Sequence, residues 1–207
     1  MQAEKRRQDI VNAGMNLFIK RGFERVSVED ICRSLDISKP TLYKYVQKKE
    51  MILSYYYQQK SVDCLPEVYD YLAKGRPAKA LQHLFTSLHE LAMTMGPELY
   101  SAYRIYTLTD PDYLSLHSRP QVKVLETCLE QLQQKHYISS NGSPHKLAMM
   151  LMDLNEGLSL TWASSKGDFD LAKVFQDYAR SMLGVRIPKG QLPDPAANPN
   201  ESVQAKN

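Results

Sequence analysis

Cysteine is scarce in this chain, which has only three cysteines among 207 residues. Cys32, Cys64 and Cys128 lie far apart and none forms a C-x-x-C pair, so a disulfide framework or a zinc site is not indicated. We expect all three to be small buried hydrophobic side chains. The same scarcity is typical of a reducing compartment and indicates a cytoplasmic protein.

Long hydrophobic runs are also absent. No uncharged run is much longer than about ten residues, whereas about 20 apolar residues are needed to span a membrane. The first ten residues, MQAEKRRQDI, lack the apolar stretch of a secretory signal. Hydrophobic residues nevertheless make up 43% of the sequence and charged residues 24%. These fractions predict a globular protein with a substantial core and no membrane partner.

Motifs for catalysis and for cofactor or metal binding are missing as well. No two of the five histidines are spaced i, i+4, and no Glu-x-x-His pair occurs. The glycines form no phosphate-binding loop, and the segment GLSLT does not complete a G-x-S-x-G motif. We therefore predict no catalytic residue, no metal and no cofactor. A helical-bundle enzyme and an interaction protein without DNA binding stay open as alternatives.

Helical periodicity is present nearly everywhere, and strand-like alternation is not. Glycine, proline and capping residues divide the pattern into nine helices, for an all-α fold. Ser27 caps the second helix and Ser38 caps the third, with Pro40 in its first turn. The other predicted helices cover residues 4–20, 50–73 (kinked near Pro66), 77–95, 98–108, 115–137, 144–165 and 168–184.

The first quarter of the chain differs from the rest in charge and in helix length. Residues 1–50 carry eleven Lys/Arg against seven Asp/Glu, whereas the remainder is close to neutral. A basic excess of this kind suits a segment that meets a polyanion. We divide the chain into a helix-turn-helix domain at 4–50 (motif 27–46), a helical effector-binding and dimerisation domain at 51–185, and an expected flexible tail at 186–207.

The second and third helices, joined by a turn of three or four residues, have helix-turn-helix geometry. In this motif the second helix enters the major groove of DNA. The segment ISKPTLYKYV fits that role, because Leu42 and Val46 supply a thin buried side and the other face is rich in donors. Lysine can reach phosphates or guanine, a threonine methyl suits thymine, and tyrosine hydroxyls suit phosphates at the groove edge.

The segments LFIKRGFERVSVEDI, ISKPTLYKYV and KKEMIL resemble, in this order, the N-terminal domain of the tetracycline-repressor (TetR) family of bacterial transcription regulators. The resemblance implies a homodimer of all-helical subunits. It also implies an N-terminal domain that binds double-stranded operator DNA and a C-terminal domain that binds a small-molecule effector. Repression relieved by the ligand is the common mode of the family, and we expect it here.

The resemblance also implies roles for individual positions. Residues that fall where the family contacts bases or nearby phosphates are Lys39, Pro40, Thr41, Tyr43 and Lys44. Residues that fall where it contacts the DNA backbone are Tyr45, Lys49, Ser27 and Val28, the last two at a helix N-terminus. Val46 departs from the family, which usually has phenylalanine there.

For the C-terminal half we predict an apolar pocket and a dimer interface. Flexible methionine side chains and aromatic side chains suit an apolar or aromatic effector, and we expect one arginine to be able to pair with a carboxylate of the ligand. The predicted lining residues are Phe85, Met93, Tyr103, Arg104, Met149, Met150, Met152 and Trp162. The apolar rows Leu147/Leu151/Leu154/Leu158 and Leu171/Phe175/Tyr178/Met182 predict a homodimer through residues 144–184.

Overall fold

The computed structural model describes residues 2–109 and 120–186, and within these ranges it is an assembly of helices without a strand. The helices are α1 (Gln2–Arg21), α2 (Val28–Leu35), α3 (Lys39–Tyr45), α4 (Glu50–Lys60), α5 (Leu65–Ala73), α6 (Pro77–Thr109), α7 (Pro120–Gln134), α8 (Pro144–Ser164) and α9 (Leu171–Leu183). The all-α prediction is confirmed. The start of the predicted 115–137 helix and nearly all of the predicted tail lie outside the described residues.

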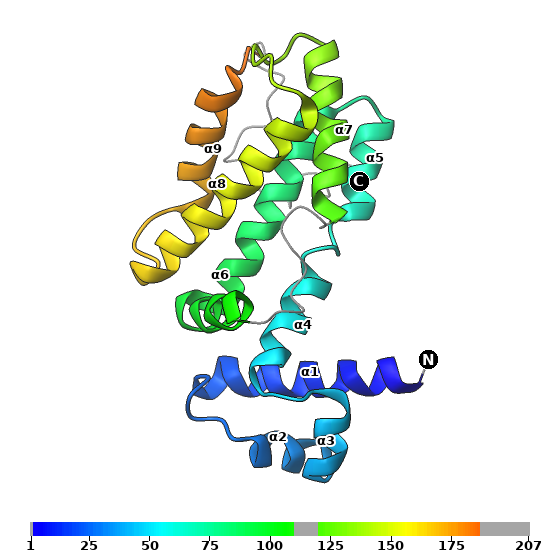
Figure 1. Ribbon diagram of the computed structural model, residues 1–207, viewed down its shortest axis with the longest axis vertical. Helices are drawn as coiled ribbons and strands as arrows, with labels where there is room; N and C mark the ends of the chain where they lie inside the picture. Colours follow the sequence, from blue (N-terminus) through cyan, green and yellow to red (C-terminus); the bar gives the residue numbers. More distant parts are fainter. Residues whose placement is uncertain (1, 110–119, 187–207) are drawn as a thin grey trace, which may run out of the picture.

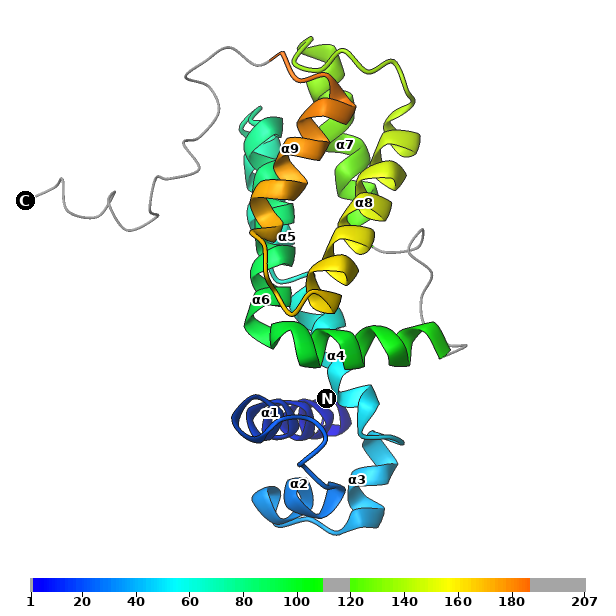
Figure 2. The same ribbon diagram turned by 90° about the vertical axis from the view of Figure 1, so that its left-hand side faces the viewer.

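The helices form two groups along the long axis of the molecule. Figure 1 shows α1, α2 and α3 at one end, with α4 rising from them toward a bundle of α5 to α9. The second half of α6 runs crosswise beneath the bundle, close to α4 and above α1 (Figure 2). None of the helices in residues 2–109 and 120–186 is long and apolar enough to cross a membrane.

Two breaks in the chain decide this arrangement. The predicted break at Gly96 is confirmed: its φ of 78° and ψ of 162° lie outside the helical region and divide α6 into two helical segments. The prediction of one helix over 50–73 is wrong, because α4 ends at Lys60 and α5 begins only at Leu65. Pro66 lies in the first turn of α5. N–H groups in the first turn have no hydrogen-bond partner within the helix, so the missing N–H of proline costs nothing there and Pro66 begins a helix instead of kinking one.

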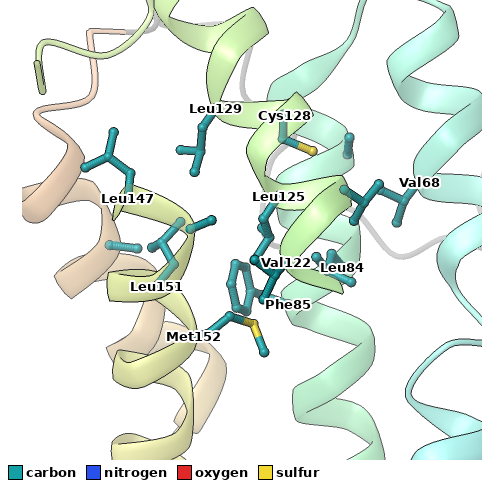
Figure 3. Close-up of a cluster of buried hydrophobic side chains, with 14 of the residues drawn as sticks. Val68, Leu84, Phe85, Val122, Leu125, Cys128, Leu129, Leu147, Leu151 and Met152 are labelled. Carbon is teal, nitrogen blue, oxygen red and sulfur yellow. The ribbon is translucent and has the colours of Figure 1, made fainter. Parts of the chain in front are cut away.

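The buried apolar side chains form two clusters. One lies inside the bundle and includes Leu84, Leu125 and Leu151, which come from α6, α7 and α8 and point toward one another (Figure 3). The other begins between α1, α2 and α3 and continues through α4 to the second half of α6. The helix-turn-helix therefore shares its core with the base of the bundle. The three cysteines are buried and unpaired, as predicted.

α1 and α4 approach most closely at Gly14. A β-carbon at this position would lie 2.9 Å from Cδ1 and 3.0 Å from Cγ2 of Ile52. Contacts this short require the neighbour to shift, and Ile52 is fully buried. Glycine at position 14 therefore allows α4 to lie directly against α1.

We expect Gly14→Val to lower the free energy of unfolding by about 1–3 kcal/mol, because the added side chain overpacks a filled interface. Urea denaturation measures the loss. The double variant Gly14→Val/Ile52→Ala should lose less than the sum of the two single variants, since valine then fills the space vacated by isoleucine. Strict additivity would show that the two side chains do not compete for space.

Candidate nucleic-acid interface and ligand cavity

Side-chain caps hold α2 and α3 at a short turn. Ser27 and Asp30 form a capping box, in which the Ser27 hydroxyl accepts from the Asp30 N–H and the Asp30 carboxylate accepts from the Ser27 N–H. Asp36 ends α2 in the left-handed conformation, with φ of 52°. Ser38 then caps α3 by accepting from the Thr41 N–H. The turn geometry is thus encoded locally, as helix-turn-helix pairs require.

α3 has one buried side and a broad exposed face, as the sequence predicts. Leu42 and Val46 are both 0% exposed and belong to the shared core, so valine fills the position where the family usually has phenylalanine. Lys39, Tyr43 and Lys44 are exposed, together with Pro40. Thr41 and Tyr45 are half-buried, and the Thr41 hydroxyl lies 2.8 Å from that of Ser38.

The cations of this face differ in their availability. Lys39 forms an ion pair with Glu29 of α2, and this contact raises the pKa of the Lys39 amine and lowers the pKa of the Glu29 carboxyl. Lys44 lies 5.9 Å from the ring of Tyr45. Lys44 and Lys48 are exposed and have no ion pair within the described ranges. These two are the cations that a polyanion meets without first displacing a carboxylate.

Lys49 has a different environment. Its ammonium donates to the backbone oxygens of Phe23, at 2.9 Å, and Val26, at 3.2 Å, and lies 4.1 Å from the centre of the Phe23 ring. Lys49 thus fastens the start of α4 to the connection between α1 and α2. Ser27 is likewise engaged, because its N–H is held by Asp30. Nothing in the sequence indicates the Lys49 contacts, because Lys49 lies 26 positions after Phe23 and 23 positions after Val26 in the chain.

Most of the residues predicted to line an effector pocket lie apart from one another. Phe85 lines a cavity, whereas Met152 points into the packed core of the bundle beside it (Figure 3). Tyr103 and Trp162 belong to the cluster shared with the helix-turn-helix, and Met149 is buried in the bundle. The side chains of Met93 and Met150 are 45% and 38% exposed.

Arg104, the predicted partner of a ligand carboxylate, is already engaged. Its guanidinium lies 2.5 Å from the carboxylate of Glu156, and both side chains are largely buried. The pair joins the second segment of α6 to α8. A ligand carboxylate would therefore have to compete with Glu156 for this arginine.

The cavity itself lies between the first segment of α6 and α9 and measures about 90 Å³. Its wall is mostly apolar and includes Leu81, Phe85, His89, Phe175, Ala179 and Leu183. The first three and the last three are each spaced i, i+4, i+8 on one helix, so each helix contributes one face. Sequence analysis found Phe85 alone, because a helix face that lines a cavity has the same periodicity as one that fills a core.

No group of three or more His, Cys, Asp and Glu side chains within residues 2–109 and 120–186 could hold a metal ion. The interface built around α3 and the apolar cavity between α6 and α9 are two candidate sites among the described residues, and a separate polar pocket lies beside Gln133, Ser140 and Arg186.

We expect Lys49→Ala to lower the free energy of unfolding by about 1.5–3 kcal/mol, because two hydrogen bonds from a charged group are lost. The matched control is Lys48→Ala, one residue earlier and exposed, which should change stability by less than about 0.5 kcal/mol. Urea denaturation compares them. Equal stability of the two variants would show that the Lys49 contacts contribute nothing.

A comparison with family models assigns the N-terminal region. Residues 10–56 match the model of bacterial regulatory proteins, tetR family. This range covers most of α1, all of α2 and α3, and the first part of α4. It therefore includes the capped helix pair and the Lys49 contact.

Whole-chain comparisons extend the similarity to the C-terminal bundle. The chain is 22% identical over 209 residues to the HTH-type transcriptional regulator AcrR of Shigella flexneri, covering 95% of this chain and 96% of AcrR. A crystal structure of Thermus thermophilus FadR, a TetR-family transcriptional repressor in complex with lauroyl-CoA, has a TM-score of 0.69 and 27% identity. It covers 93% of this chain and 99% of FadR.

A gamma-butyrolactone receptor described as ArpA-like shares the fold, with a TM-score of 0.55 and 19% identity over 93% of each chain. The match of the N-terminal model, the capped helix pair with its exposed second helix, and the whole-chain similarities agree. The N-terminal region therefore matches the tetR family of bacterial regulatory proteins, and the chain is similar over nearly its whole length to the regulators AcrR and FadR.

Proposed function

We propose that this protein is a cytoplasmic transcriptional repressor, not an enzyme, that binds operator DNA as a homodimer through α3. A small apolar or aromatic effector bound in the C-terminal bundle releases it. The observation that carries the proposal is the composition of α3. Its buried side consists of little more than Leu42, anchored to the shared core, and its exposed face offers lysine and tyrosine donors.

The proposed base contacts come from the exposed face of α3, with Lys44 as the principal one. Lysine donates to guanine O6 and N7 in the major groove, and Lys44 has no competing carboxylate within the described residues. Lys39 can contribute only by leaving Glu29. The other proposed contacts near the groove are Pro40, Thr41 and Tyr43, with Tyr45, Ser27 and Val28 at the DNA backbone.

The contacts of Lys49 change its proposed role. Because its ammonium already binds two backbone carbonyls, we propose that Lys49 acts as a positioning residue that holds the α1–α2 connection in place. The exposed Lys48 then supplies the phosphate contact at this end of the motif. Val28 keeps its proposed contact with the DNA backbone, because it is the first residue of α2 and backbone N–H groups at a helix N-terminus bind anions.

The proposed effector site is the apolar cavity between α6 and α9. The described FadR structure contains lauroyl-CoA, a ligand with an apolar acyl chain, and the apolar wall of the cavity suits a chain or ring of that chemistry. An effector releases DNA only if it binds the non-operator conformation more tightly. The second segment of α6, packed on α4, connects the two sites.

The proposed dimer forms through α8 and α9. Leu147, Leu151, Leu171 and Phe175 of the predicted apolar rows are buried within the subunit's own bundle. The faces left exposed carry Met150, Gly157 and Leu160 on α8 and Tyr178 on α9. A β-carbon added at Gly157 would meet nothing within 4 Å, so this face is open to a partner helix. A two-fold dimer would present two α3 helices to successive major grooves.

We expect Lys44→Ala to relax base preference at one or two operator positions, at a cost of about 1–3 kcal/mol for the preferred sequence. Lys48→Ala should instead weaken binding evenly on all sequences and reduce the salt slope by about 0.9, the value for one phosphate contact. Gel shifts at several salt concentrations, on DNA flanking the gene and on base-substituted copies, separate the two effects.

The control for these variants is Lys146→Ala, an exposed lysine at the start of α8, which should leave operator affinity unchanged. If neither Lys44→Ala nor Lys48→Ala altered operator binding, α3 would not be the recognition helix. An enzyme or a scaffold protein without a DNA role would give no shift with any variant.

We expect Leu160→Glu to convert the dimer into a monomer, because a charge would be buried in the proposed interface near the C-terminal end of α8. Sedimentation at micromolar concentration measures the mass. The matched control is Met93→Glu, which places the same charge at an exposed apolar position on α6, outside residues 144–184, and should leave a dimer. A dimeric Leu160→Glu protein would exclude this face as the interface.

A further inference from the structure

A carboxylate of α2 lies against the first residue of the proposed recognition helix. Glu29 is the second residue of α2, and it forms an ion pair with Lys39, the first residue of α3. The side chains of Glu29 and Lys39 are 49% and 50% exposed, so a partner from solvent can reach the pair. Because the N-terminal residues of a recognition helix contact base edges, this ion pair lies where α3 would meet the bases.

Glu29 differs in its surroundings from the neighbouring carboxylate, Asp30. Asp30 accepts from the Ser27 N–H at 2.9 Å and pairs with Arg33 at 3.3 Å, so it is held within α2 and its cap. Glu29 instead reaches across to α3, where hydrogen bonding with Lys39 lowers the pKa of its carboxyl. Glu29 is therefore ionised at neutral pH, and its ion-pair partner is a lysine that DNA attracts.

Binding of DNA changes the surroundings of this carboxylate. A phosphate or a guanine that attracts Lys39 takes the cation away from Glu29. The carboxylate is then left beside a polyanion, which repels it unless the DNA supplies a hydrogen-bond donor. The amino groups of cytosine N4 and adenine N6 are the donors that bases present in the major groove. Glu29 therefore responds to whether the DNA carries such a donor at this place.

The order of the groups on the base edges favours cytosine. A G·C pair presents two acceptors, guanine N7 and O6, followed by the cytosine N4 donor, whereas the adenine N6 donor of an A·T pair lies between two acceptors, adenine N7 and thymine O4. A carboxylate on adenine N6 would have an acceptor on each side, but one on cytosine N4 has an acceptor on one side only. Since lysine suits guanine O6 and N7, a single G·C pair can receive both Lys39 and Glu29.

We propose that Glu29 is a specificity-determining residue that accepts a hydrogen bond from one cytosine N4 amino group in each operator half-site. On DNA without a cytosine at that position, the charge of Glu29 opposes binding. This inference rests on the proposed function, because it requires that α3 enters the major groove. It adds one acceptor to a face whose lysine and tyrosine side chains are donors.

Binding-site selection from a randomised duplex library, carried out with the full-length protein, tests the proposal. We expect the wild type to select cytosine at one position of each half-site and Glu29→Ala to lose that preference. Gel shifts should show Glu29→Ala binding the selected operator about five- to tenfold more weakly than the wild type. Glu29→Ala should bind a scrambled duplex more tightly, with a salt slope steeper by about 0.9, because the freed Lys39 can contact a phosphate.

Substitution of the DNA gives the matching measurement. Replacing the selected C·G pair by T·A should weaken binding of the wild type by about five- to tenfold, and that of Glu29→Ala by less than about twofold. Equal losses in the two proteins would overturn the proposal, because the cytosine would then be recognised by another side chain.

Two further variants separate the carboxylate from its surroundings. Glu24→Ala removes an exposed carboxylate between α1 and α2 and should leave the cytosine preference unchanged. Lys39→Ala should weaken binding to both duplexes and keep the cytosine preference, because Glu29 is still present. Circular dichroism checks that each variant is folded. If folded Glu29→Ala kept the cytosine preference, or bound both duplexes more tightly by the same factor, Glu29 would act only as a like charge and the proposal would fail.

The same experiments separate this inference from the proposed function. If the wild type shifts no DNA, the proposed function fails and the role of Glu29 fails with it. If the wild type binds operator DNA and Glu29→Ala selects the same bases, only the role of Glu29 fails. If Glu29→Ala loses the cytosine preference and Lys39→Ala keeps it, both stand.

Discussion

The packing of α4 between α1 and the second segment of α6 is the constraint on which the rest of this structure depends. Gly14 lets α4 lie against α1, and Tyr57 of α4 stacks on Tyr103 with ring centres 4.4 Å apart. Tyr100 adds an edge contact to the same ring at 6.0 Å. Because interiors are close-packed, α4 cannot shift on one side without disturbing the other.

This shared core gives the chain a physical route between its two sites. α6 begins beside the cavity and breaks at Gly96, and its second segment packs against α4, so one helix touches both the cavity wall and the support of the helix-turn-helix. Gly96 adopts a positive φ that glycine reaches without strain, and this break redirects the second segment across the base of the bundle (Figure 2). A ligand that alters the distance between α6 and α9 would therefore act on a helix that already contacts α4.

The charge that the helix-turn-helix presents to a partner depends on which lysines are already bound to other groups, as well as on how many lysines there are. The first fifty residues have a clear basic excess, but Lys39 is paired with Glu29 and the Lys49 ammonium binds backbone carbonyls. Lys44 and Lys48 remain exposed. The pairing of Lys39 has a further consequence, since a polyanion that attracts Lys39 would release Glu29, whose charge then opposes binding.

The sequence by itself determined the features that are local in the chain. Helical periodicity, the caps at Ser27 and Ser38, and the break at Gly96 each depend on neighbouring residues, and the structure contains all of them. The segment that resembles the family was recognisable for the same reason. Even here, Pro66 was ambiguous, because proline both kinks helices and begins them, and only packing selects between the two.

Tertiary structure alone decided which residues form the sites. Leu151 and Phe85 lie on apolar helix faces with the same sequence pattern, yet Leu151 fills a core and Phe85 lines a cavity. Helical periodicity predicts that a face is buried, but it does not predict which residues or spaces lie against that face. The Lys49 contacts and the Arg104–Glu156 pair join residues more than 20 positions apart. His89 is buried, with its pKa lowered to about 4, only because helices that are distant in the sequence pack around it, and no stretch of the chain carries that information alone.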